Sequence, residues 1–186
     1  MARKPRNQPA AEFHHITNQG ARRGDIYLDD FDRRTFLDLI GGAWEKYGLI
    51  IHAYCLMGNH YHLLAQFPER NMPTVMHWIG TCFSQQINRR HDFTGRLCKD
   101  RYFNEPIDND DYLMAAARYI HRNPKDLSFP INQLDRYWAS SYGAYLGLVA
   151  KPQWLETSLV MGLFANDRAA LRAFTETPLP SDLAAS

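Results

Sequence analysis

Two histidines in the segment His60-Tyr61-His62 have the spacing of a paired metal site. Successive side chains of an extended strand point to opposite faces, so the two imidazoles project together and Tyr61 projects away from them. Neighbouring imidazoles are common ligands of divalent cations. His-X-His patterns also arise by chance and in structural pairs, and the pattern alone leaves both interpretations open. Its position directly after a tight turn, in an otherwise apolar strand, favours the metal site.

A tyrosine and an asparagine one helical turn apart form a second candidate group. In the segment 110–122 the apolar residues follow a helical period, and Tyr119 and Asn123 share a stripe next to the apolar face. A structural interpretation is also open, with Tyr119 as a boundary aromatic and Asn123 as a helix end before Pro124. Pro124 further disfavours helical backbone at Asn123.

The two groups together indicate a chemistry that neither indicates alone. A divalent cation bound by two imidazoles and an amide oxygen keeps open positions for phosphate oxygens. A phenol next to that cation can attack a phosphodiester and form a covalent phosphotyrosine. The phenol must lose its proton first, because its ordinary pKa is about 10.

The surrounding sequence predicts the elements that must position these residues. Two β-prone runs joined by Gly58-Asn59 are typical of a β-hairpin, and Asp29 and Gly48 are suitable first and last residues of a helix. The order β-α-β-β-α-β-α predicts an α+β fold. We expect an antiparallel sheet of about four to five strands with helices on its faces, a split βαβ arrangement of ferredoxin or RRM type, followed by C-terminal helices. The expected strands are 12–17, 49–57, 60–67 and 102–107, and the expected helices are 29–47, 73–90 and 110–122.

The length of 186 residues predicts one main domain with small additions. We expect a flexible basic arm over residues 1–10, the main domain over 11–150 and a C-terminal helical extension over 151–186. The composition, 45% hydrophobic and 22% charged, is that of a soluble globular protein and excludes disordered and fibrous classes. No apolar run reaches the roughly 18 residues of a membrane span, and no secretory signal is recognisable. Three scattered cysteines exclude a disulfide framework, so a cytoplasmic location is expected.

The formal net charge of +1 does not mark a nucleic-acid-binding protein, and the positions of the charges are more informative than their sum, although each charged run also suits a solvated face or loop. Basic residues interleaved with aromatic ones over 89–101 suit phosphate contacts and base stacking on single-stranded or hairpin DNA. Of three further residues, Cys55 is expected in the core, His121 on the surface, and Trp138 against the sheet. The candidate DNA-binding residues are Arg22, Arg23, Arg89, Arg90, Arg96, Lys99, Arg101, Arg118 and Arg122.

Five segments, FHHIT, AYCLMGNHYHLL, NRRH, YLMAAARYIHRNP and YWASSYGAY, together resemble the REP-associated tyrosine transposases. These are single-tyrosine HUH transposases of the IS200-like superfamily, and the motifs occur in the same order and spacing from about residue 13 to 145. The resemblance implies that His60 and His62 are the metal ligands of the HUH motif and that Tyr119 is the nucleophile. It also implies that Asn123 completes the coordination of Mg or Mn, at a position where better-known relatives use glutamine.

The same resemblance implies an activity and a partner. Members cleave single-stranded DNA beside palindromic repeat (REP) hairpins, which they recognise with a short guide sequence, and rejoin the ends through a covalent 5′-phosphotyrosine. A cytoplasmic, nucleoid-associated enzyme is expected.

Other interpretations stay open at the level of sequence. One is an architectural or regulatory protein that binds hairpin DNA with little catalysis. Another is a metal-dependent hydrolase on a barrel, which the long helices predicted over 29–47 and 73–90 disfavour. A monomer is favoured, because the C-terminal extension is placed to cover a dimerisation face, but a dimer stays open, with the active site formed within one chain or across two.

Overall fold

Four strands form a single antiparallel sheet in the order β2-β3-β1-β4. The computed structural model describes residues 13–127 and 129–179, and the predicted arm over residues 1–10 lies outside them. Because β3 pairs antiparallel with both β1 and β2, those two strands run parallel to each other with β3 between them. This is the split βαβ arrangement, and the predicted fold class is confirmed. The strands are β1 (Phe13–Gln19), β2 (Ile50–Leu56), β3 (His60–Gln66) and β4 (Phe103–Ile107).

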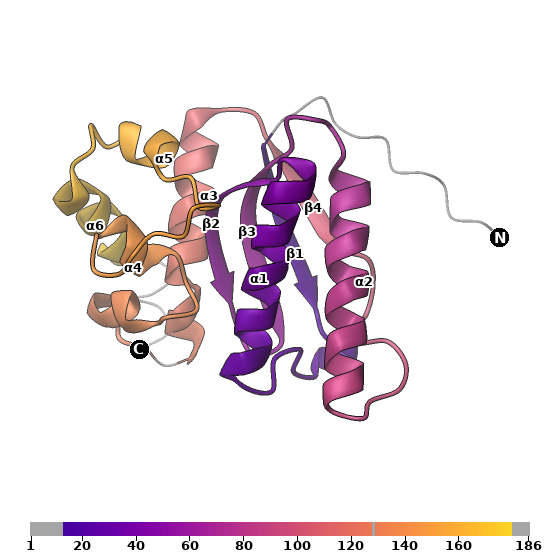
Figure 1. The fold of residues 1–186 in the computed structure, drawn as a ribbon. Coiled ribbons are helices and arrows are strands. Elements are labelled where there is room, and N and C mark those ends of the chain that lie inside the picture. Colours follow the sequence, from indigo (N-terminus) through magenta and orange to yellow (C-terminus); the bar gives the residue numbers. More distant parts are fainter. Residues whose placement is uncertain (1–12, 128, 180–186) are drawn as a thin grey trace.

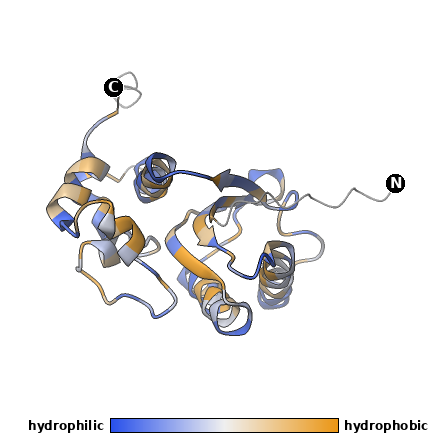
Figure 2. Ribbon diagram, turned by 90° about the horizontal axis from the view of Figure 1, so that it is seen from above, coloured by the Kyte–Doolittle hydropathy of each residue, from blue (hydrophilic) through white to orange (hydrophobic). Residues whose placement is uncertain are grey.

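The long helices lie on opposite faces of this sheet. Helices α1 (Asp30–Tyr47) and α2 (Met72–Arg90) pack side by side in front of it in Figure 1, and α3 (Asp110–Arg122) lies behind it, against β2 and β3. The view from above shows the sheet between these two layers, with hydrophobic ribbon in the central strands (Figure 2). One face of the sheet therefore carries the main core and the other faces a single helix.

Local sequence signals explain where these elements begin and end. The side chain of Asp29 accepts a hydrogen bond from the Asp32 backbone N–H and caps α1. Gly48 ends the helix with φ of 69°, in the left-handed region that suits glycine. At the hairpin, the Met57 N–H donates to the His60 carbonyl at 2.9 Å across Gly58-Asn59. The predicted hairpin and the predicted ends of α1 are confirmed.

The main core is aromatic and lies between the sheet, α1 and α2. The Phe36 ring packs 4.7 Å from Tyr61 of β3 and 5.1 Å from Phe83 of α2, measured between ring centroids. All three side chains are buried. Since Tyr61 faces this core, alternation along β3 sends the histidines on either side of it toward α3.

Residues after α3 cover the outer edge of β2 and the far side of α3. The Leu56 N–H donates to the Ala139 carbonyl and the Glu156 N–H to the Ile51 carbonyl, which protects an otherwise unpaired strand edge. In Figure 1 the C-terminal helices lie beside α3. They are α4 (Tyr142–Tyr145), α5 (Ser158–Gly162) and α6 (Arg168–Glu176), and the short 3-10 helices are η1 (Ala21–Arg23), η2 (Asn123–Leu127) and η3 (Ile131–Arg136).

This covering layer overturns two sequence predictions and confirms one. His121 is buried, not at the surface, because it packs against Tyr142 and Tyr145 and bonds the Ser141 hydroxyl at 2.9 Å. Trp138 is 43% exposed, with the Arg34 guanidinium over its ring, and so does not pack against the sheet. Cys55 is fully buried, as predicted. Within the described residues, no helix has the length and apolar character needed to cross a membrane.

Candidate active site

The two histidines of β3 lie on the sheet face that α3 covers. The His60 and His62 ring centroids are 5.0 Å apart, and the rings are nearly perpendicular. His62 is 7% exposed and His60 is half-buried. The predicted projection of both imidazoles from one face is therefore confirmed.

Tyr119 reaches the same place from α3. Its ring centroid lies 5.2 Å from that of His62 and 5.7 Å from that of His15 on β1, with an edge-to-face arrangement in both pairs. The side chain is 53% exposed, so one side of the ring packs on the histidines and solvent reaches the rest. The fold thus brings together His62 and Tyr119 from segments 57 positions apart.

Asn123 lies one turn beyond Tyr119 and turns back toward the histidines. Its Nδ2 donates to the Tyr119 carbonyl at 2.9 Å, and its side chain hydrogen bonds to His60. The backbone at Asn123 is helical, with φ −50° and ψ −36°. The expected effect of Pro124 is therefore not seen, because α3 passes directly into η2 and Asn123 stays in the helical region.

Burial keeps the imidazoles of this cluster uncharged. It lowers the pKa of His62 to about 3, with a smaller contribution from the neighbouring His15 and His60. Burial also lowers the pKa values of His60 and His15, and the Glu105 carboxylate on β4 partly opposes this at His15. A neutral imidazole has a lone pair to offer a cation, so the protonation state suits metal binding.

His15 is a member of the cluster that the sequence did not reveal. Its Nε2 lies 2.9 Å from Nδ1 of His62, and the two rings are stacked at 5.2 Å. The register of β1 against β3 places Thr17 opposite His62 and Leu64 opposite His15, so the two histidines are diagonal neighbours. The available signal was the pair His14-His15 in a predicted strand, but only the register tells which of them faces α3.

The donor set fits a divalent cation of the kind that binds mixed nitrogen and oxygen ligands. Two neutral imidazoles and one amide, from His60, His62 and Asn123, converge on the space next to Tyr119. Among the described residues, no three His, Cys, Asp or Glu side chains are arranged to hold a metal. The Asn123 amide, which hydrogen bonds to His60, is a further candidate donor beside the two imidazoles.

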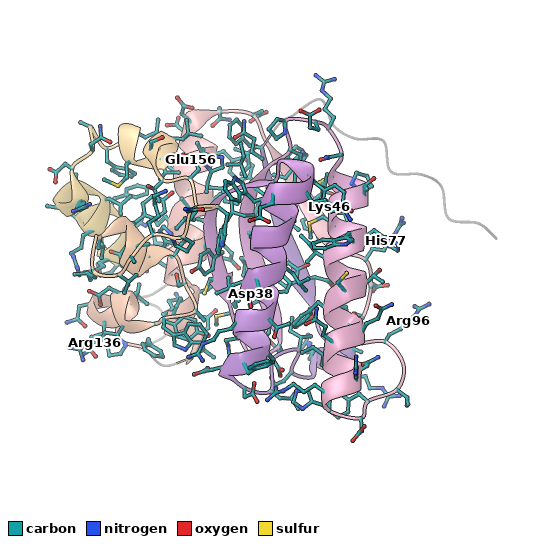
Figure 3. All side chains as sticks on the ribbon, in the orientation of Figure 1. Asp38, Lys46, His77, Arg96, Arg136 and Glu156 are labelled. Atoms are coloured by element: carbon teal, nitrogen blue, oxygen red, sulfur yellow. The ribbon has the colours of Figure 1, made fainter. Side chains whose placement is uncertain are left out.

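Basic residues from two segments gather at the same end of the sheet. Gly20 forms a bridge with Cys98, and the Lys99 N–H donates to the Gln19 carbonyl at 3.0 Å. These contacts set the loop after β1 beside the loop before β4. Figure 3 shows Arg96 pointing outward from the second loop. The exposed basic residues on the two loops are Arg22, Arg23, Arg96, Lys99 and Arg101.

The remaining predicted DNA-binding residues differ in their surroundings. Arg89 is exposed at the end of α2. Arg90 is paired with Asp29 at 2.6 Å and with the fully buried Asp32, which ties α2 to the start of α1. Arg118 and the buried Arg122 donate to the Thr177 carbonyl at the end of α6. Arg90, Arg118 and Arg122 therefore hold elements together, which does not support the expectation that they contact DNA.

Comparison with known proteins identifies a family and a similar fold. The family model described as "Transposase IS200 like" matches residues 10–123, a span that includes the histidine pair, Tyr119 and Asn123. No curated protein matches the chain. The structure of a REP-associated tyrosine transposase bound to a REP hairpin is similar in fold, with a TM-score of 0.65 at 15% identity over 84% of this chain and 92% of that one. A candidate transposase from Deinococcus radiodurans R1 gives a TM-score of 0.44 at 15% identity, over 61% of this chain and 92% of that one. Since the family model spans more than half of its length, the chain belongs to the IS200-like transposase family.

Proposed function

We propose that the protein is a metal-dependent transposase that cleaves and rejoins single-stranded DNA beside palindromic REP hairpins through a covalent 5′-phosphotyrosine. The observation that carries the proposal is the convergence of His60, His62 and Asn123 around the exposed ring of Tyr119. A nucleophile next to a set of metal ligands, at a solvent-facing position, suits attack on an extended strand of DNA. These residues meet within one chain, which favours an active site that works in a monomer.

In the proposed reaction the Tyr119 oxygen attacks the scissile phosphorus. The phenol proton passes to solvent, which reaches the half-exposed side chain, and the bond from phosphorus to the 3′-oxygen breaks. That oxygen takes up a proton and leaves as a free 3′-OH, while the 5′-phosphate stays bonded to Tyr119. Attack by a 3′-OH on this linkage reverses the step and rejoins DNA. Bound Mg²⁺ or Mn²⁺ supplies charge neutralisation at the phosphate and stabilises the departing oxygen.

The proposed partner is hairpin DNA with a single-stranded flank. The basic loops that carry Arg22, Arg23, Arg96, Lys99 and Arg101 lie beside the hairpin turn before His60, where the Gly20 N–H donates to the Asn59 carbonyl at 2.8 Å. Phosphates bound by these loops are next to the proposed metal ligands. The similarity in fold to a transposase bound to a REP hairpin supports the same class of DNA.

A cleavage assay tests the proposal directly. Labelled single-stranded DNA carrying the host's own palindromic repeat and flanks is incubated with the full chain in Mg²⁺, Mn²⁺ or EDTA and run on a denaturing gel. The wild type is expected to give a protein–DNA adduct only with metal, and Tyr119→Phe is expected to give none.

Tyr112→Phe is the matched control, because it removes the same hydroxyl from the same helix two turns earlier. It is expected to keep the adduct. An adduct that survives in Tyr119→Phe would reject the nucleophile. Tight hairpin binding by the wild type with no cleavage in either metal would instead favour a DNA-binding protein with little catalysis.

A further inference from the structure

His60 and His62 of β3 each have a hydrogen-bond partner at Nδ1 of the imidazole ring. Nδ1 of His62 lies 2.9 Å from Nε2 of His15, and Nδ1 of His60 lies 2.7 Å from Oδ1 of Asn59. The partners come from different places, since His15 is on the neighbouring strand and Asn59 is in the turn. In each ring Nε2 is the second nitrogen, and the His60 ring also hydrogen bonds to the side chain of Asn123, the third proposed ligand.

The bond to Asn59 determines which nitrogen of His60 carries the proton. The Asn59 Nδ2 donates to the Arg23 carbonyl at 3.1 Å, which turns Oδ1 toward His60. An amide oxygen only accepts hydrogen bonds, so Nδ1 of His60 must be the donor. In a neutral imidazole the lone pair is then on Nε2.

The bond between His15 and His62 has two arrangements with opposite consequences. If His15 donates, the single proton of neutral His62 is on Nε2 and blocks coordination there. If His62 donates from Nδ1, its Nε2 carries a lone pair that a metal can use. Only the second arrangement is compatible with His62 as a ligand, and in it His15 is the acceptor.

His15 is a partner of the ligand and not a ligand itself. Its Nε2 is already directed at His62, and its ring also packs against the edge of Tyr119. One side chain therefore contacts both a proposed metal ligand and the proposed nucleophile. Hydrogen bonds of this kind commonly fix the tautomer and the ring orientation of metal-bound histidines.

We propose that His15 and Asn59 are positioning residues that hold His62 and His60 with the proton on Nδ1 and the lone pair of Nε2 directed at a divalent cation. The inference rests on the proposed function, because it requires the metal site. Loss of such a partner typically weakens metal binding by about 10- to 100-fold.

The first test measures Mn²⁺ binding to the full-length protein without DNA. The electron paramagnetic resonance signal of free Mn²⁺ is followed as Mn²⁺ is added to the protein. His15→Ala and Asn59→Ala are each expected to raise the Kd at least about tenfold. His15→Gln and Asn59→Asp keep an acceptor oxygen near the same position, and both are expected to bind Mn²⁺ close to the wild-type Kd. His77→Ala is the matched control, since this histidine projects outward from α2 (Figure 3).

The second test reads the tautomer itself. Long-range ¹⁵N–¹H spectra of the metal-free, histidine-labelled protein are expected to show His60 and His62 protonated at Nδ1. In His15→Ala, the proton of His62 is expected to move to Nε2, with His60 unchanged. A loss of packing alone would not move the proton between the two nitrogens.

The outcomes separate this inference from the proposed function. If His62→Ala abolishes Mn²⁺ binding while His15→Ala and Asn59→Ala bind like the wild type, the inference is wrong and the metal site stands. If His62→Ala itself binds like the wild type, the proposed metal site fails. If circular dichroism shows that an alanine variant does not fold, His15→Gln or Asn59→Asp is used in its place. A proton on Nε2 of His62 in His15→Gln, or on Nε2 of His60 in Asn59→Asp, would overturn the inference, because each variant keeps an acceptor for the Nδ1 proton.

Discussion

Asn123 connects the proposed ligand set to the nucleophile at the level of single residues. It is one methylene shorter than the glutamine that better-known relatives use, yet its backbone continues the helix and its side chain reaches His60. The same amide donates to the Tyr119 carbonyl. The short side chain reaches His60 because the backbone stays helical at Asn123 despite the following Pro124.

Asn123→Ala is expected to weaken Mn²⁺ binding at least about tenfold and to lower the rate of adduct formation in parallel, because it removes the amide oxygen. Asn123→Asp keeps an oxygen at that place and adds a negative charge, so Mn²⁺ binding is expected to be as tight as in the wild type or tighter. The Mn²⁺ titration and the adduct assay check both. Equal Kd values for the wild type and Asn123→Ala would remove Asn123 from the ligand set.

Sequence patterns predicted the elements well but not the contacts between them. Gly58-Asn59, Asp29 and Gly48 are local signals, and they set the hairpin and the ends of α1 to within a residue or two. The shared face of His60 and His62 follows from strand alternation alone. The contact of His15 with His62 depends on the register between β1 and β3, which no local pattern encodes.

The misplacement of His121 has a similar cause. The segment 110–122 reads as a helix with one apolar face, because the sheet is the only partner that the pattern reveals. In the structure a second layer, with Tyr142 and Tyr145, covers α3 from the other side. Arg90 likewise forms hydrogen bonds with Asp29 and Asp32, about 60 positions earlier in the sequence. The number of charges in a segment cannot predict such a long-range pairing.

The buried His121, which packs between α3 and α4, makes the free energy of unfolding depend on pH. Burial lowers its pKa to about 3, below the ordinary value of 6.5. Between these two values the unfolded chain binds a proton at His121 that the folded chain does not. The free energy of unfolding therefore falls as pH falls from about 6.5 toward 3.

His121→Gln is expected to reduce this dependence. Between pH 7 and pH 5 the free energy of unfolding should fall by about 2 kcal/mol less in His121→Gln than in the wild type. The figure follows from about 1.4 kcal/mol for each pH unit below 6.5. Urea denaturation at the two pH values measures it, with His77→Gln on the surface of α2 as the control. An unchanged difference between pH 7 and pH 5 in His121→Gln would contradict the assignment.

At the scale of the whole molecule, the positions of the charged residues are more informative than the net charge. The net charge is only +1, but exposed basic side chains from two loops meet at the end of the sheet next to the candidate site. Figure 3 shows Arg96 at this side of the molecule and Arg136 at the opposite side. The proposed path of the DNA therefore follows the basic loops toward Tyr119.

Arg96→Ala is expected to weaken hairpin binding and to reduce the slope of log K against log salt concentration by about 1, because one phosphate contact is lost. Arg136→Ala removes an exposed arginine from the other side and is expected to leave the slope unchanged. Fluorescence anisotropy with a labelled hairpin over a series of salt concentrations checks both. Identical slopes for the two variants would show that the basic loops do not bind phosphate.

Tyr119 lies in the last turn of α3 and Asn123 directly follows that helix, while His60 and His62 belong to a single strand, β3. The proposed site thus combines residues from two elements, β3 and the end of α3. Because Asn123 directly follows α3, a displacement of this helix would alter the distances of both Tyr119 and the Asn123 amide from the histidines. Arg118 and Arg122 fasten that helix to the end of α6. Substitutions at the end of α6 that disturb these contacts are therefore expected to move Tyr119 and Asn123 together, although they lie far from the reacting groups.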